Sequence, residues 1–106
     1  MMRIVLSETA KTDIQETLSF YRAPSQLADS FSYTFEAGVH HLQQWPYTGH
    51  RRRDLTKADV CFWFEDPYLF VFQISDETLS IVAVLHSSRN VVRILRQRLR
   101  KPRPTS

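Results

Sequence analysis

The sequence of 106 residues predicts a single α+β domain, and three features of the chain support this prediction. A short apolar run at residues 3–6 opens the chain, two segments with helical periodicity follow it, and three β-rich runs lie close together in the second half. The length allows one hydrophobic core but not two. We assign residues 1–100 to this domain and expect residues 101–106 to form a disordered basic tail.

The first half of the chain predicts one strand followed by two helices. Ser7 is a suitable N-cap for a helix that must end before Pro24, because proline disfavours the helical conformation of the residue before it. Ser25 is a suitable cap for a second helix, which Trp45 and Pro46 bring to an end. The few residues between the two segments predict a helical hairpin. We expect Trp45 to pack from the end of the second helix into the core.

The second half of the chain predicts a three-strand meander and a closing helix. The β-rich runs cover residues 60–64, 68–75 and 78–86, and links this short require antiparallel neighbours. The middle run is apolar on both faces, which is typical of a central strand. We expect the opening strand to join the meander in one antiparallel-rich sheet with the helical hairpin on one face. The closing helix is expected at residues 89–100.

Positive charge is concentrated at the end of the chain. Residues 87–106 contain seven basic residues and no acid, whereas the preceding residues hold the other seven bases and all eleven acids, so that +7 and −4 combine to the total of +3. In the closing helix four arginines lie opposite the apolar stripe: Arg89, Arg93, Arg96 and Arg100. This arginine stripe is either a solvated face or a surface that binds an acidic protein or nucleic acid.

A second basic cluster precedes the meander. Arg51, Arg52 and Arg53 are consecutive, and Asp54 and Asp59 follow them closely. The cluster is either a binding surface for nucleic acid or an acidic partner, or a solvated loop whose charges the two aspartates partly balance.

Several classes of site are excluded by the residue patterns. The histidines and Cys61 lack metal-ligand spacing, and the chain has no glycine-rich phosphate loop and no nucleophile elbow, so we expect neither a metal nor another cofactor. A single cysteine excludes an internal disulfide and fits a reducing compartment. No apolar run approaches the roughly 20 residues of a membrane helix, and no signal peptide opens the chain. We therefore expect a soluble, cytoplasmic protein without a membrane partner.

The most specific sequence block is the end of the last strand, where Ile81-Val-Ala-Val-Leu-His86 runs into Ser87-Ser88-Arg89-Asn90. Weaker pieces are spread along the chain: Leu6-Ser7, Ala10, Asp13-Ile14, Tyr21, Ala28, Phe31, Leu42, Trp45 to Gly49, Arg51 to Leu55 and Tyr68 to Phe72. Together these residues resemble the RelE/ParE superfamily of type II toxin–antitoxin toxins, and more closely its ParE-like branch.

The resemblance implies a small toxin that causes growth arrest, of the kind used in plasmid stabilisation. A cognate antitoxin encoded next to it would neutralise it, and higher-order toxin–antitoxin assemblies are possible. ParE-like members are DNA gyrase inhibitors that act by binding. RelE-like members are ribosome-dependent endoribonucleases that cut mRNA, and on that alternative His86 and Arg89 would be catalytic, together with one or more of Arg51 to Arg53.

Binding is the function that the sequence favours. The closing helix contains neither tyrosine nor histidine, which the ribonuclease chemistry would need as late acid–base groups. We therefore expect no catalytic residue, and we expect a target- or antitoxin-binding role for Arg51, Arg52, Arg53, Arg89, Arg93, Arg96 and Arg100. One departure from the family pattern keeps a third function open. Cys61-Phe62-Trp63 stands where the family often has an arginine, so a degenerate toxin that only binds its antitoxin is the remaining alternative.

Overall fold

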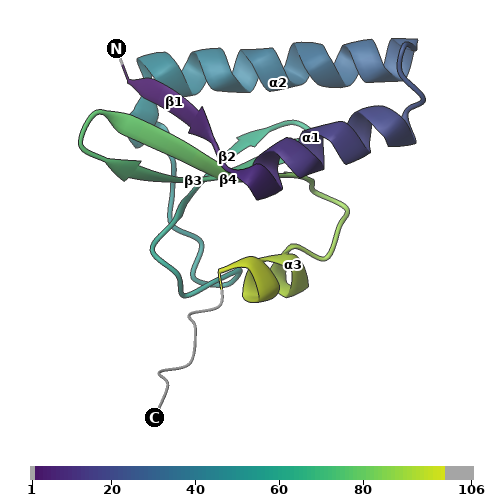
Figure 1. Cartoon of the computed structure of the whole chain (residues 1–106). Helices are drawn as coiled ribbons and strands as arrows, with labels where there is room; N and C mark the ends of the chain where they lie inside the picture. Colours follow the sequence, from purple (N-terminus) through teal and green to yellow (C-terminus); the bar gives the residue numbers. More distant parts are fainter. Residues whose placement is uncertain (1, 100–106) are drawn as a thin grey trace.

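The computed structural model describes residues 2–99 and confirms the predicted α+β class. Its elements, in chain order, are β1 (Arg3–Leu6), α1 (Glu8–Phe20), α2 (Gln26–Gln44), the 3-10 turn η1 (Pro46–Thr48), β2 (Cys61–Glu65), β3 (Tyr68–Ser75), β4 (Thr78–His86) and α3 (Val91–Arg98). Figure 1 shows them as three layers, with α1 and α2 on one side of the sheet and α3 on the other. The predicted tail and Arg100 lie outside the described residues.

The four strands form one mixed sheet with the order β1-β4-β3-β2. The meander is antiparallel throughout, as predicted, and the opening strand joins it by pairing parallel to β4. β1 reaches only from Arg3 opposite Thr78 to Leu6 opposite Ile81, so the second half of β4 has no strand on its outer side. Because β3 lies between β4 and β2, it is the central strand that its two apolar faces predicted.

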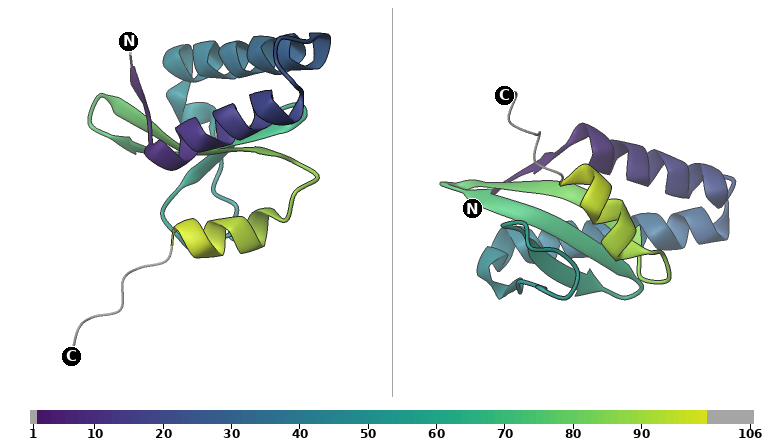
Figure 2. Two further views of the ribbon diagram at one scale, coloured as in Figure 1. Left: turned by 45° about the vertical axis from the view of Figure 1, so that its right-hand side comes forward. Right: turned by 90° about the horizontal axis from the view of Figure 1, so that it is seen from below.

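Two apolar clusters cover the two faces of the sheet. The cluster on the hairpin side contains Phe70 and Phe72 of β3 together with residues of α1 and α2. The cluster on the opposite side contains Leu69 and Val71 of β3, with Leu95 of α3 against them. Figure 2 shows α3 lying across that opposite face when the molecule is viewed from below. One sheet therefore supports two separate surfaces, a hairpin face and an α3 face.

The helix boundaries follow from side-chain caps. The hydroxyl of Ser7 accepts a hydrogen bond from the Ala10 amide at 3.1 Å, and the hydroxyl of Ser25 does the same for the Ala28 amide at 3.1 Å, so both predicted N-caps are confirmed. The closing helix begins at Val91, two residues later than expected, because Asn90 acts as its N-cap. Within residues 2–99, no helix has both the length and the apolar composition that crossing a bilayer requires.

The prediction for Trp45 was wrong. This residue is the C-cap of α2 and its side chain is 59% exposed. The tryptophan that packs near this end of α2 is Trp63 from β2, whose ring stacks on His41 with a centroid distance of 3.8 Å. The chain leaves α2 through Pro46 at the start of η1, and this exit directs Trp45 away from the sheet.

A β-bulge in β4 decides which of its side chains face which layer. Val71 of β3 pairs with Ala83, but the next residue, Phe72, pairs with Ile81, so that Val82 is an extra residue. Ile81 belongs to the hairpin-side cluster and Ala83 to the α3-side cluster, although a regular strand would place residues two apart on the same face. The bulge therefore reverses the alternation for the end of β4.

α2 approaches the sheet closely at Gly38. A Cβ atom at this position would lie 2.5 Å from Cζ of Phe70, and that ring is fully buried in the hairpin-side cluster. The absence of a side chain at residue 38 is thus what allows the helix to lie directly on the phenylalanine.

We predict that Gly38→Ala destabilises the protein, although alanine is the better helix former by roughly 1 kcal/mol. Overpacking against the buried Phe70 ring should outweigh that gain and lower the free energy of unfolding by about 1–3 kcal/mol. Ser30→Ala, at an exposed site of the same helix, is the control and should be neutral or slightly stabilising. Urea unfolding of the three proteins measures both effects. A stabilised Gly38→Ala variant would mean that the helix can move away from the sheet without cost.

Candidate functional site

In the loop between η1 and β2, two of the three consecutive arginines form ion pairs with aspartates. Arg51 forms an ion pair with Asp59 at 2.5 Å, and Arg52 forms one with Asp54 at 2.8 Å. The hydrogen bond between Arg52 and Asp54 raises the pKa of the guanidinium and lowers the pKa of the carboxyl. Arg53 donates only to the backbone carbonyl of Lys57, at 3.4 Å. Within the described part of the chain, Arg53 is therefore the one arginine of the cluster without an acidic partner.

A pocket of about 330 Å³ lies between this loop and α3. Its basic lining residues are Arg53 and Lys57 from the loop and Arg96 from the helix, and Leu55 and Val92 supply apolar walls. The single acid in the lining is Asp54, which already pairs with Arg52. The structure thus brings two cations of the loop together with Arg96, which is about 40 residues away in the sequence, and it places them beside the apolar walls.

We use the name basic surface for Arg53, Lys57, Arg93 and Arg96. Arg93 and Arg96 are exposed and one helical turn apart, while Val91 and Leu95 are buried against the sheet, as the periodicity predicted. Among residues 2–99, neither Arg93 nor Arg96 has a carboxylate within ion-pair distance. The basic surface is therefore a solvent-facing group of uncompensated cations on the α3 face.

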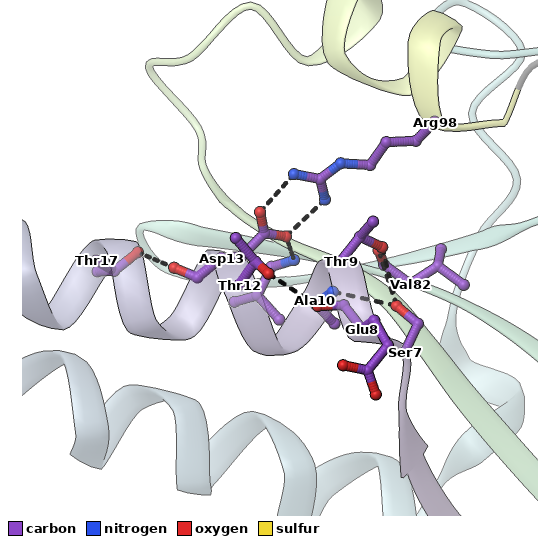
Figure 3. A network of polar contacts seen from close by, with 10 residues as sticks. Ser7, Glu8, Thr9, Ala10, Thr12, Asp13, Thr17, Val82 and Arg98 are labelled. Atoms are coloured by element: carbon purple, nitrogen blue, oxygen red, sulfur yellow. Dashed lines mark hydrogen bonds and ion pairs between the residues drawn. The ribbon is translucent and has the colours of Figure 1, made fainter.

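A buried ion pair joins α3 to the rest of the molecule. Asp13 of α1 is only 2% exposed, and Arg98 of α3 donates to both of its carboxylate oxygens, at 2.7 and 2.5 Å. One of these oxygens also accepts the backbone N–H of Val84 in β4, at 3.0 Å. Figure 3 shows the guanidinium reaching from α3 to the carboxylate on α1. The hydrogen bond to Asp13 raises the pKa of Arg98, so this arginine is a structural residue and its charge is not available to a ligand.

His86 and Arg89 lie elsewhere. After the bulge at Val82, the end of β4 presents Val84 and His86 to the hairpin side, where the His86 ring contacts the edge of Tyr68 with a centroid distance of 5.3 Å. His86 and Arg89 line a pocket of about 430 Å³ together with residues from the end of α1. The structure therefore does not bring these two residues together with Arg51, Arg52 or Arg53, which lie in the loop that borders the α3 face.

Tyr68 is the most strongly perturbed titratable group of this second pocket. Its side chain is buried, and its hydroxyl lies 3.0 Å from the hydroxyl of Tyr21. Burial is the main cause that raises the pKa of Tyr68, and the hydrogen bond with Tyr21 raises it further. The phenol therefore keeps its proton to a higher pH than an ordinary tyrosine does.

The family model for the ParE toxin of the ParDE type II toxin–antitoxin system matches residues 4–91. The chain belongs to the ParE toxin family. This membership implies a cognate antitoxin as partner. A solved structure described as the chromosomal ParDE system from P. aeruginosa is similar, with a TM-score of 0.65 and 18% sequence identity, and the match covers 81% of this chain and 96% of that chain. At this identity the likeness supports the fold alone. No curated protein sequence matches.

The family match ends at Val91, where α3 begins. Arg93 and Arg96 therefore come after the matched segment. Sequence reasoning missed two residues of importance here. Lys57 follows Arg53 by four residues but is not part of the consecutive arginines, and Arg98 looks like the other arginines of its helix. The signal for Arg98 was its position on the apolar side of α3, near Leu95 and away from Arg93 and Arg96.

The ion pair between Asp13 and Arg98 generates a test of stability. Arg98→Met keeps much of the aliphatic stem but leaves a buried carboxylate without its cation, which should cost about 3–5 kcal/mol. Adding Asp13→Asn should recover part of that loss, because the amide oxygen can still accept the Val84 amide. Arg96→Met, on the exposed side of the same helix, should change stability by about 0.5 kcal/mol or less. Denaturant unfolding of the two single variants and the double variant completes the cycle. If the losses in the free energy of unfolding of the two single variants add up to that of the double variant, the two residues do not interact.

The raised pKa of Tyr68 predicts a loss of stability in alkali. Because the folded state favours the protonated phenol, its contribution is complete below the ordinary tyrosine pKa of 10.0 and decreases as the pH rises above that value. At pH 7, Tyr68→Phe should be less stable than the parent by roughly 0.5–1.5 kcal/mol, the value of one hydrogen bond. Above pH 10 this difference in the free energy of unfolding should shrink and then change sign. The control Tyr47→Phe, at an exposed site, should have the same pH dependence of stability as the parent. Parallel stability curves for Tyr68→Phe and the parent would contradict the assignment.

Proposed function

We propose that this ParE-family toxin inhibits DNA gyrase by binding it through the basic surface. The observation that carries the proposal is that Arg53, Lys57 and Arg96 line one pocket, and that Arg93 is exposed one turn before Arg96 on α3. None of these four cations has an acidic partner among residues 2–99. Gyrase holds DNA, so phosphate groups are present at its working site. A cation that is already paired gains less from such a ligand, so we leave Arg51, Arg52 and Arg98 out of the proposed surface.

The proposed action is inhibition of gyrase by binding. It takes place in the cytoplasm, the compartment where gyrase works. The apolar walls at Leu55 and Val92 allow an interface that combines buried apolar area with peripheral charges. Phosphate contacts of this kind are strongly dependent on salt, because each neutralised phosphate releases counterions. Inhibition should therefore weaken as the salt concentration rises.

A ribonuclease would have to use the other pocket. There His86 and Arg89 lie with Glu16 and Tyr21, so acid–base groups and a cation are present in one place. Arg51 to Arg53, which such an enzyme would need for the developing phosphate charge, are not among the residues that line it. This separation supports gyrase binding over RNA cleavage.

The main prediction concerns the triple variant Arg53→Gln, Arg93→Gln and Arg96→Gln. Expression of this variant should no longer arrest growth. When the purified variant is added to gyrase, the amount of DNA that gyrase leaves cleaved should be at least about tenfold lower than with the parent. A tenfold loss corresponds to about 1.4 kcal/mol of binding free energy. The substitutions lie at exposed positions and should change stability by about 0.5 kcal/mol each. The control variant Arg3→Gln, Lys11→Gln and Arg22→Gln removes the same charge from other exposed sites and should remain toxic.

Three readouts separate the alternatives. Full toxicity of the basic-surface variant, with unchanged salt dependence, would contradict the proposed surface. Loss of toxicity with His86→Ala in a folded protein, together with mRNA cuts in the ribosomal A site, would identify a ribonuclease. Absence of toxicity in the parent, with retained antitoxin binding, would identify the degenerate toxin that Cys61-Phe62-Trp63 suggested.

A further inference from the structure

The pocket of about 430 Å³ on the hairpin face has no role in the proposed binding of gyrase. It lies where the end of α1, the start of β3 and the loop after β4 meet, and Figure 1 shows the turn of the helical hairpin and that loop at the same end of the molecule. We call it the hairpin pocket. The lining residues that carry the argument below are Glu16, Phe20, Tyr21, Tyr68, His86 and Arg89.

The two tyrosines leave one hydroxyl proton for a ligand. Tyr68 is only 4% exposed, and its hydroxyl has one hydrogen-bond partner in the described chain, the hydroxyl of Tyr21 at 3.0 Å. Either hydroxyl can be the donor of this bond, and both tyrosines line the pocket. In either arrangement the pair uses one of its two protons, and the other is available to a ligand beside Tyr21, the less buried partner.

His86 supplies a second donor. Its Nδ1 atom accepts the backbone N–H of Ser88 at 3.0 Å and also lies 2.7 Å from the Ser88 hydroxyl. Because Nδ1 accepts a hydrogen bond from an amide, the proton of the neutral ring is on Nε2. The loop after β4 thus fixes the tautomer and leaves an N–H group on the side of the ring away from Ser88.

Arg89 supplies the third donor and a full charge. It is exposed and has no carboxylate within ion-pair distance among residues 2–99. The one acid in the lining is Glu16 of α1, which forms no ion pair with Arg89. Three hydrogen-bond donors, one of them a permanent cation, favour an anionic acceptor group, and a carboxylate fits the planar guanidinium best.

An apolar wall adjoins these donors. Phe20 is 80% exposed, which is unusual for a residue of this size, and its ring packs edge-on against Tyr21 with a centroid distance of 5.4 Å. Val84 adds apolar surface from β4. Aromatic side chains next to an arginine are the typical composition of an energetic centre in a protein–protein interface. The pocket is therefore suited to a protein ligand more than to a free anion.

We propose that the hairpin pocket binds the cognate antitoxin through an acidic side chain, held by Arg89, Tyr21 and His86, and a neighbouring apolar side chain, held against Phe20. The proposal rests on the antitoxin partnership that the family membership implies. A second copy of this chain, with a net charge of +3, is a poorer match for a donor-rich pocket. Because the pocket and the basic surface lie on opposite faces of the sheet, neutralisation by the antitoxin and action on the target involve different residues.

The test uses the full chain and the purified antitoxin encoded by the adjacent reading frame. Phe20→Ala and Arg89→Gln should each raise the dissociation constant by about 10–100-fold, as expected for residues at an energetic centre. Tyr47→Ala and Arg3→Gln alter exposed residues outside the pocket and should change it by less than about threefold. In cells, Phe20→Ala should remain toxic and should require more antitoxin for rescue than the parent does.

The possible results are distinct. If the parent binds the antitoxin and both pocket variants bind it with the parental affinity, the hairpin pocket is not the site. If the variants change self-association of the toxin and leave antitoxin affinity unaltered, the occupant is a second copy and the proposal is wrong. If the parent itself does not bind the antitoxin at micromolar concentration, the antitoxin partnership fails, independently of any result on gyrase.

Discussion

The outer edge of β4 is the constraint on which the rest of the structure depends. β1 pairs with this strand only as far as Ile81, so the backbone groups beyond it need other partners. The first turns of α1 supply them: the hydroxyl of Thr9 donates to the Val82 carbonyl, and the carboxylate of Asp13 accepts the Val84 amide. Figure 3 shows Thr9 and Asp13 on α1, with Val82 of β4 beside Thr9. The helix therefore takes the place of a missing strand.

This solution places a carboxylate in the interior and so requires a cation. Arg98 provides it from α3, and the bidentate pair then connects a helix of the hairpin face with the helix of the opposite face. A buried charge without its partner would be costly, so that α3 is held in position by electrostatics as well as by Val91 and Leu95. The geometry of the basic surface depends on this attachment, because Arg93 and Arg96 lie on the same short helix.

The bulge at Val82 separates the two proposed surfaces. It turns the end of β4 so that His86 lies with Tyr68 on the hairpin face, away from the cations at α3. The surfaces also differ in chemistry. The basic surface is a group of solvated charges suited to phosphate or acidic protein, whereas the hairpin pocket combines aromatic rings with oriented hydrogen-bond donors. A toxin that must bind both a target and a neutralising partner can thus evolve the two contacts independently.

The sequence by itself determined the elements and their class. The predictions that rested on local signals were confirmed. These signals are the helix caps at Ser7 and Ser25, the short links in the meander and the two apolar faces of residues 68–75. The opposed apolar and basic sides of the closing helix were also visible, because helical periodicity is local.

Only the tertiary structure decided which charges are available and which residues meet. Arg98 looks like its neighbours in sequence, and its pairing with Asp13, 85 residues away, depends on the open edge of β4. The bulge at Val82 leaves no pattern in the sequence, because residues 81–85 are all apolar, and it determines the face on which His86 lies. The exposure of Trp45 follows from how the chain leaves α2. The ion pair of Arg98 and the placement of His86 were beyond the sequence because both depend on long-range packing that no local period encodes.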